Sequence, residues 1–153
     1  MAVNMLNASA YSSTTGEWAT PPDLFERLDR EFRFTLDVCA THQNAKCRRY
    51  FTRKEDGLVQ PWSGNVWMNP PYGRGIDQWV AKAASSGVRC VCLLPVRSDT
   101  RWWHAYVMRA SEIRLLTRRL SFEGSTNKAP FPAAIVLFEP GSPRRLHVTS
   151  MEA

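Results

Sequence analysis

The stretch Val66-Trp67-Met68-Asn69-Pro70-Pro71-Tyr72 decides the fold class of this 153-residue chain. Its first three residues are apolar and predict a short buried strand, and Asn69 follows directly at the end of that strand. The two prolines fix φ and remove two backbone N–H groups, so they hold the chain extended and leave its carbonyls free to accept. We therefore expect a binding loop at the carboxyl end of a strand, where α/β sheets bind their ligands.

Segments with helical and strand-like patterns alternate on both sides of this stretch. Apolar residues at helical spacing predict helices from Pro21 to Phe32, with Thr20 as the cap, from Ile76 to about Gly87, and from Ser98 or Asp99 to Ala110. Further strands are expected at residues 34–38, 88–94, 113–116 and 134–138. This alternation predicts an α/β fold with a mostly parallel sheet and helices on both faces. The last two strands have no helix between them and are expected to form an antiparallel pair.

Length and composition predict one soluble domain, which we place at residues 16–140, between a flexible leader at 1–15 and a polar tail at 141–153. The leader has no basic region followed by an apolar one, so we do not expect a signal peptide. No run of 18 apolar residues exists, which excludes a transmembrane helix. The four cysteines are expected to be free thiols in a reducing cytosol. Because Cys39-x2-His42-x4-Cys47 matches zinc spacing poorly, we expect no metal.

The chain carries 20 Lys and Arg against 14 Asp and Glu, a formal net charge of +6. Such a surface attracts a polyanion, for which nucleic acid is one candidate. Charge alone does not decide the partner, because a modest excess of cations is often only a solvated surface.

The residue types after the strand suit the methylation of a planar amine. The side-chain oxygen of Asn69 and the carbonyl of Pro70 can both accept hydrogen bonds from one NH2 group, and the ring of Tyr72 can stack on a flat substrate. The lone pair of an exocyclic amine is delocalised into its ring, and two acceptors help to localise it toward an incoming methyl group. A target base inside a duplex would have to be flipped out. The competing interpretation is a proline-rich turn without chemistry.

Several further motifs accompany Asn69-Pro70-Pro71-Tyr72 in a fixed order. They are Trp18-Ala-Thr20-Pro21-Pro22, Leu36-Asp37-Val38-Cys39-Ala40, Asn44-Ala-Lys-Cys47, Tyr50-Phe51-Thr52, Asp56-Gly57-Leu58 with Trp62, Arg97-Ser-Asp99-Thr100 with Trp102-Trp103, and Ala129-Pro-Phe-Pro132. The four-residue motif resembles motif IV of S-adenosylmethionine-dependent amino methyltransferases. From about Trp18 to Phe138, the chain is similar to the phage-type DNA N6-adenine methyltransferases.

This resemblance implies a class I methyltransferase fold, S-adenosylmethionine as methyl donor, and double-stranded DNA as substrate. It implies that Asn69, Pro70, Pro71 and Tyr72 form the catalytic loop. The implied donor-binding residues are Thr20 and Pro21 at the amino-acid end, Asp37, Ala40 and Asp56. Asp37 either pairs with the donor's ammonium group or holds the loop beneath it. Asp56 either accepts from the donor's adenine amine or belongs to an ordinary Asp-Gly turn.

The chain departs from the family pattern in two places. Cys39-Ala-Thr-His stands where a Gly-rich loop is common, although the small Ala40 still permits a close approach. Only Cys39–Asn65 separates the first strand from the strand before Asn69, so the usual second and third strands must be shortened or absent. Asn44 and Glu55 are the candidates for the ribose ligand. Aromatic residues divide into two expected sets: Trp18 and Trp62 beside the donor's adenine, and Trp79, Trp102, Trp103 and Tyr106 in the core.

DNA contacts are expected from loops, because no separate recognition domain fits in this length. The segment Thr117–Pro132 is the main candidate, with Arg118, Arg119 and Lys128, and Arg97 and Arg101 lie near the expected catalytic edge. These side chains are expected to contact phosphates rather than to read bases. We expect a monomer or weak homo-oligomer without membrane contact, in the cytoplasm of a bacterial host and encoded by a phage or prophage.

Two other functions remain open at this point. The same loop suits methylation of another planar nitrogen group, namely a protein glutamine amide or a guanine amine of ribosomal RNA. The compressed region between Asp37 and Asn65 also fits a non-catalytic DNA-binding protein of the same fold.

Overall fold

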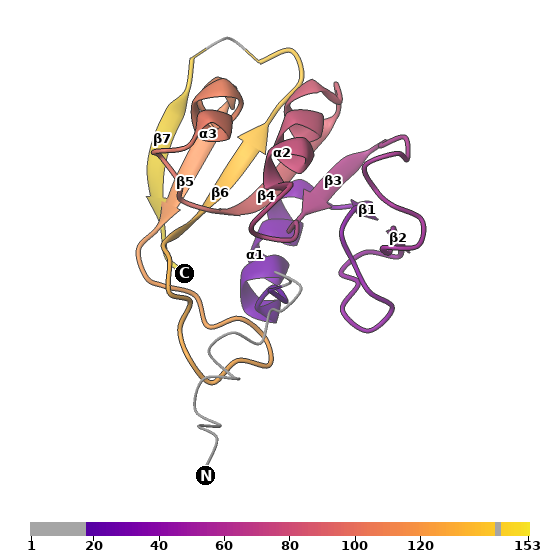
Figure 1. Ribbon diagram of the computed structural model, residues 1–153, viewed down its shortest axis with the longest axis horizontal. Helices are drawn as coiled ribbons and strands as arrows, with labels where there is room; N and C mark the ends of the chain where they lie inside the picture. Colours follow the sequence, from indigo (N-terminus) through magenta and orange to yellow (C-terminus); the bar gives the residue numbers. More distant parts are fainter. Residues whose placement is uncertain (1–17, 143–144) are drawn as a thin grey trace.

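A mixed seven-stranded sheet organises the molecule, with the strand order β2-β1-β3-β4-β6-β5-β7 (Figure 1). The computed structural model describes residues 18–142 and 145–153, so the predicted leader at 1–15 lies outside the described residues. The elements in chain order are α1 (Pro22–Phe32), β1 (Leu36–Asp37), β2 (Arg49–Tyr50), β3 (Asn65–Met68), α2 (Ile76–Ser85), β4 (Arg89–Pro95), α3 (Arg101–Ala105), the 3-10 turn η2 (Val107–Arg109), β5 (Glu112–Leu116), β6 (Ala133–Phe138) and β7 (His147–Met151).

The strand directions confirm the predicted mostly parallel sheet with an antiparallel pair. Strands β2, β1, β3 and β4 run parallel, and β6 is antiparallel to both β4 and β5. The shortened region is confirmed as well, because between β1 and β3 the chain forms only the two-residue strand β2. The α/β fold with helices on both faces, expected of a class I methyltransferase, is therefore what the chain adopts.

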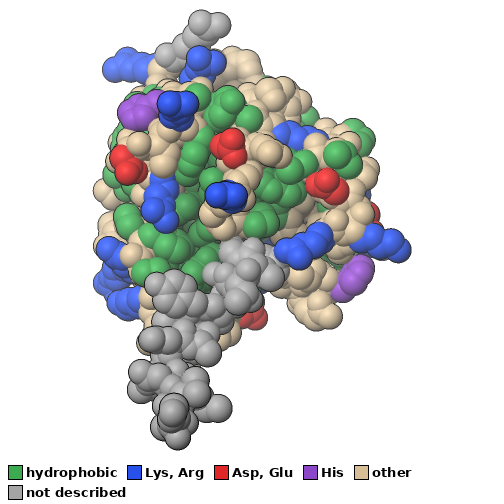
Figure 2. Space-filling model, in the orientation of Figure 1, with side chains coloured by type: hydrophobic (Ala, Val, Ile, Leu, Met, Phe, Trp, Pro, Cys, Tyr) green, Lys and Arg blue, Asp and Glu red, His purple; other side chains and the backbone are tan. Residues whose placement is uncertain are grey.

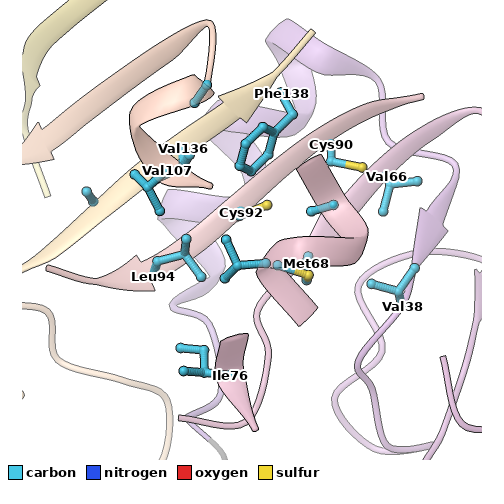
Figure 3. Close-up of a cluster of buried hydrophobic side chains, with 14 of the residues drawn as sticks. Val38, Val66, Met68, Ile76, Cys90, Cys92, Leu94, Val107, Val136 and Phe138 are labelled. Carbon is cyan, nitrogen blue, oxygen red and sulfur yellow. The ribbon is translucent and has the colours of Figure 1, made fainter. Parts of the chain in front are cut away.

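Side chains alternate between the two faces of the central strands, as the pleat of a strand requires. On one face, Val66, Cys90 and Cys92 pack beneath α2, α3 and η2 (Figure 3). On the other face, Trp67, Val91 and Leu93 pack against the apolar side of α1. All six of these side chains are at most 1% exposed, so the sheet is a two-sided core that fixes the strand ends rigidly.

Three local predictions need correction. Helix α1 begins at Pro22 with Pro21 at its N-cap and no side-chain cap bond, so Thr20 is not its cap. Helix α3 begins at Arg101 and is capped by the side chain of Thr100, which accepts from the backbone N–H of Trp103, rather than by Ser98 or Asp99. The predicted polar tail at 141–153 contains β7, which pairs in parallel with β5 along His147–Met151. Four of the five β7 residues are exposed, so no apolar pattern marks the strand, which is held by its backbone pairing with β5 and by Met151 packing against the core on the α1 side.

The predicted core aromatic residues occupy the α2–α3 side of the sheet. Trp103 is buried, and Trp79, Trp102 and Tyr106 pack against the same cluster while partly exposed. Trp62 is also buried there, and its indole N–H donates to the Gly57 carbonyl. We therefore correct the expectation for Trp62, which belongs to the core rather than beside a ligand.

Candidate active site

A cavity of about 280 Å³ lies where β1 and β3 end. Parallel strands present their carboxyl ends at one edge of a sheet, which is the lower edge in Figure 1. Among the residues that sequence reasoning selected, the cavity is lined by Thr20, Asp37, Ala40, Asp56, Asn69 and Pro71, together with Trp18 and Asn44. Pro21, Pro70, Tyr72 and Glu55 are not among its lining residues. The strand edge therefore brings most of the predicted donor-site residues together around one hollow.

Asn69 is held by its amide nitrogen and presents its amide oxygen unpaired. The Nδ2 group donates to the backbone carbonyl of Trp18 and, over 3.0 Å, to the hydroxyl of Thr20. A carbonyl only accepts, so the contact with Trp18 determines which end of the amide is the NH2 group. Within the described part of the chain, Asn69 Oδ1 is the one buried side-chain nitrogen or oxygen atom without a hydrogen-bond partner. Such an atom is costly to keep in a fold, so it calls for a partner from outside the described chain.

Tyr72 does not line the cavity and packs against the hydrophobic clusters on both faces of the sheet. Its hydroxyl donates to the carbonyl of Leu93 over 3.0 Å, and burial raises the pKa of Tyr72 well above its usual value. The ring meets Phe131 and Phe122 edge-on, at centroid distances of 5.4 and 6.3 Å. Stacking of Tyr72 on a substrate stays a prediction, because in this structure the ring is packed against these two phenylalanines.

Asp37 holds the loop beneath the cavity. One carboxylate oxygen accepts from the backbone N–H of Cys39 and the other from that of Lys46, at 3.2 and 3.0 Å. The side chain is 2% exposed, and this burial raises the pKa of Asp37 even though both hydrogen bonds favour the charged form. Of the two roles considered for Asp37, the bonds match the loop-holding one.

The segment after β1, which stands where a Gly-rich loop is common, forms a tight turn held by its own hydrogen bonds. The N–H of Thr41 donates to Asn44 Oδ1 over 2.7 Å, and the N–H of Asn44 donates to the Thr41 hydroxyl over 3.2 Å. Ala40 is 9% exposed, and its N–H donates to the Phe51 carbonyl. The side-chain oxygen of Asn44 is thus engaged in shaping the turn, and a ribose contact by Asn44 stays a prediction.

Asp56 and Gly57 form another part of the cavity wall. Asp56 is exposed, has a positive φ of 56°, and accepts from the N–H of Leu58 through its own carboxylate. Gly57 packs so closely against the end of β1 that a Cβ built on it would lie 2.3 Å from the carbonyl oxygen of Val38. No larger residue fits there without moving the backbone of one segment.

Sequence reasoning missed Lys82, which fixes this wall from α2. Its ammonium group donates to the carbonyls of Gly57 and Leu58, at 3.1 and 2.7 Å, and also to that of Gln60. Partial burial lowers the pKa of Lys82. In the sequence Lys82 looks like any surface lysine of a helix, so no local signal identifies it.

The loop between β5 and β6 closes the site on the side of α1. Phe122 is buried against Trp18, at a centroid distance of 5.1 Å, and the N–H of Glu123 donates to the Ala19 carbonyl over 2.9 Å. The carboxylate of Glu123 also pairs with Lys46, a cavity residue, at 3.4 Å. Apolar and polar contacts therefore anchor Thr117–Pro132 to the cavity, and these contacts could not be predicted from its sequence.

All five predicted DNA-contacting residues lie in or just after loops at the carboxyl edge of the parallel strands. Their side chains are exposed, and none of them lines the cavity; they are Arg97, Arg101, Arg118, Arg119 and Lys128. On the face drawn in Figure 2, Lys and Arg side chains are dispersed around a central apolar area rather than gathered in one patch. Contact with DNA stays a prediction for each of them.

Residues 18–142 and 145–153 contain no group of three or more His, Cys, Asp or Glu side chains placed to hold a metal ion. Over the same residues, no helix has the length and apolar character needed to cross a membrane.

Comparisons with known proteins agree with the resemblance seen in the sequence. A family model described as DNA N-6-adenine-methyltransferase (Dam) matches residues 8–151. A DNA N-6-adenine-methyltransferase of Escherichia phage T1 is 30% identical over 102 residues, which are 63% of this chain and 42% of that protein. The putative methyltransferase YfdM of Escherichia coli K12 is 34% identical over 64 residues, covering 37% of this chain and 70% of the relative.

Among solved structures, a predicted O-methyltransferase, protein Atu636 of Agrobacterium tumefaciens, aligns with 87% of this chain and 64% of its own length. The identity is 21% and the TM-score 0.37. This chain spans less than half of the length of the phage T1 relative. The family model, in contrast, covers nearly the full sequence: the chain belongs to the DNA N-6-adenine-methyltransferase (Dam) family.

Proposed function

We propose that this chain transfers a methyl group from S-adenosylmethionine to the N6 amine of adenine in double-stranded DNA. The observation that carries the proposal is the buried, unpaired Oδ1 of Asn69, a residue that lines the cavity. A buried acceptor of this kind needs a donor, and an exocyclic amine supplies one. The carbonyl of Pro70 follows in the chain as the second acceptor.

The cavity suits the proposed methyl donor in its chemistry. Phe51 and Trp79 offer apolar surface for an adenine ring, and the exposed carboxylate of Asp56 is an acceptor for its amine. The backbone near Thr20 leads into α1, whose N-terminal end favours a carboxylate. The volume of about 280 Å³ is just below the usual range of ligand sites, which begins at about 300 Å³. When bound, S-adenosylmethionine supplies an electrophilic methyl group on a sulfonium centre.

The residues of this chain act on the target amine and not on the methyl group. Asn69 Oδ1 and the Pro70 carbonyl accept hydrogen bonds from the two N–H groups of the target amine, which turns the nitrogen lone pair toward the cavity. The amine nitrogen gains the carbon–nitrogen bond, the sulfur keeps the electron pair of the broken bond, and one amine proton passes to water. Most of the rate gain then comes from positioning the two reactants.

DNA is the expected substrate because the chain is basic and five of its exposed Lys and Arg side chains lie in or just after loops at this edge. A paired adenine has its amine inside the duplex, so the base must leave the stack to reach Asn69. We expect the protein to act as a monomer or weak homo-oligomer. We also expect it to act in the cytoplasm of a bacterial host, since the relatives come from Escherichia coli and Escherichia phage T1.

Substrate competition tests the proposal. Duplex DNA, ribosomes and peptide release factors are each incubated with labelled methyl donor, and the products are digested and separated. We expect label in N6-methyladenine only. Label in a glutamine amide or a guanine amine would replace DNA as the substrate, and DNA binding without donor binding would identify a non-catalytic member of the family.

A further inference from the structure

The segment Trp18–Thr20 fixes the orientation of the Asn69 amide. Trp18 and Thr20 precede α1, while Asn69 follows β3, and the two contacts join residues 51 and 49 positions apart in the sequence. Because the two N–H bonds of Asn69 are used here, its oxygen is left as the acceptor. If the amide turned over, the NH2 group would face the substrate amine, and two donors would oppose each other.

The Thr20 hydroxyl is well placed for this task. Its side chain is 3% exposed and accepts from Asn69 Nδ2 over 3.0 Å. The neighbouring residues cannot drift, because the carbonyl of Ala19 accepts from Glu123 and the ring of Trp18 packs edge-on against Phe131 at 5.5 Å. Thr20 therefore contributes a rigid acceptor rather than a mobile surface hydroxyl.

We propose that Thr20 is a positioning residue that acts through Asn69: the Trp18 carbonyl selects the orientation of the amide, and the Thr20 hydroxyl accepts its second N–H and holds the amide where it can accept from the target amine. This inference rests on the proposed function, and it assigns Thr20 a role other than contact with the donor's amino-acid end. The two roles separate experimentally. A positioning residue affects the rate of methyl transfer at saturating donor, whereas a donor contact affects donor affinity.

Two substitutions of Thr20 provide the test. Thr20→Val keeps the shape and removes the acceptor, and Thr20→Ser keeps the acceptor and removes a methyl group. We expect Thr20→Val to lower the single-turnover rate at least about tenfold, because a buried N–H loses its partner. Donor affinity by calorimetry should stay within about threefold of the wild type, and Thr20→Ser should retain most of the rate. Thr149→Val, on the exposed strand β7, is the matched control and should match the wild type.

A second measurement does not depend on activity. The side-chain NH2 signals of Asn69, assigned by their loss in Asn69→Ala, should exchange slowly with solvent in the wild type and in Thr20→Ser. In folded Thr20→Val they should exchange at least about tenfold faster. Unchanged exchange, or a loss of donor affinity with an unchanged rate, would overturn the role of Thr20. Absence of any DNA methylation by the wild type, with slow exchange intact, would refute the proposed function and leave the positioning contact standing.

Discussion

Replacing Asn69 by Asp changes one NH2 group to an oxygen atom and almost nothing else in size or shape. In the native protein that NH2 group donates to the Trp18 carbonyl and to the Thr20 hydroxyl. In Asn69→Asp at about pH 8, a carboxylate oxygen faces the Trp18 carbonyl, so two acceptors oppose each other in a half-buried site. The variant therefore loses the contact that sets the orientation of the group.

The size of the effect follows from the lost hydrogen bond to the Trp18 carbonyl, because the Thr20 hydroxyl can turn and donate to the new carboxylate. A buried group left without its partner costs about 1–3 kcal/mol, and more when it is charged. Because only the correctly oriented group accepts from the substrate amine, we assign most of this cost to the transfer step. The expected loss in single-turnover rate at about pH 8 is between about 10-fold and 1000-fold.

Lowering the pH should restore part of the rate of Asn69→Asp. Burial against a carbonyl raises the pKa of the introduced carboxyl, so its protonated form becomes populated as the pH falls. The protonated acid has one O–H, which can donate to Trp18 while the other oxygen accepts from the substrate. The ratio of the variant rate to the wild-type rate should rise between about pH 8 and about pH 6.

The assay is single-turnover methylation of a DNA duplex at saturating donor, over that pH range. Asn69→Ala is the control, since alanine neither donates nor accepts and should recover at no pH. A variant Asn69→Asp as fast as the wild type at about pH 8, or a rate ratio independent of pH, would refute the argument that the NH2 contacts orient this group.

Three further outcomes are expected. Lys82→Met removes the hydrogen bonds to three loop carbonyls, so it should lower the free energy of unfolding by about 1–2 kcal/mol in urea titration. It should also weaken binding of the methyl donor in calorimetry, and an unchanged affinity for the methyl donor would contradict the role of the lysine in shaping the cavity wall. Gly57→Ala places a Cβ against the Val38 carbonyl and should destabilise the fold by more than Gly124→Ala. At Gly124 the space is open and only the positive φ of 80° opposes the change, which should cost about 1 kcal/mol. Equal unfolding curves for the two variants would contradict the close packing of Gly57. Arg118→Ala and Arg119→Ala should each reduce the slope of log affinity for DNA against log salt concentration by about 1, without changing the preferred DNA sequence. A slope equal to that of the wild type would show that these residues do not contact DNA phosphates.

The sequence allowed accurate prediction of those elements whose side chains are buried in a regular pattern. Helix α1 is an example, because Leu24, Phe25, Leu28 and Phe32 all face the core at helical spacing. Strand β4 is another, because its apolar run matches the length of a buried strand. In both elements the local pattern and the tertiary packing agree, so a local reading is sufficient.

Prediction failed where backbone pairing or distant contacts decide. Strand β7 has mostly exposed side chains, and only its register beside β5 makes it a strand. Thr20 before a proline resembles a helix cap, but its hydroxyl is engaged by Asn69, which lies far along the chain. Lys82 and Glu123 are ordinary charged residues in the sequence, and only the fold brings them to carbonyls and to Lys46.

The residues of the candidate site could therefore be predicted, but the contacts that hold them in place could not. The motif residues Asn69, Asp37 and Asp56 reach one cavity, as expected from strand ends that share an edge. What orients them could not be predicted, since Asn69 is held by a residue before α1 and the Asp56 turn by a lysine of α2. The contacts of Tyr72 with Phe122 and Phe131 could not be predicted for the same reason, because both phenylalanines come from a distant loop.

The most direct test of the central claim is the nucleoside composition of genomic DNA after expression in a bacterial host that lacks adenine methylation. Mass spectrometry of the digested DNA should find N6-methyladenine with the wild-type chain and none with Asn69→Ala at equal amounts of folded protein. No N6-methyladenine with the wild type, or the same amount with Asn69→Ala, would contradict the account of a methyl group delivered to an adenine amine held by Asn69.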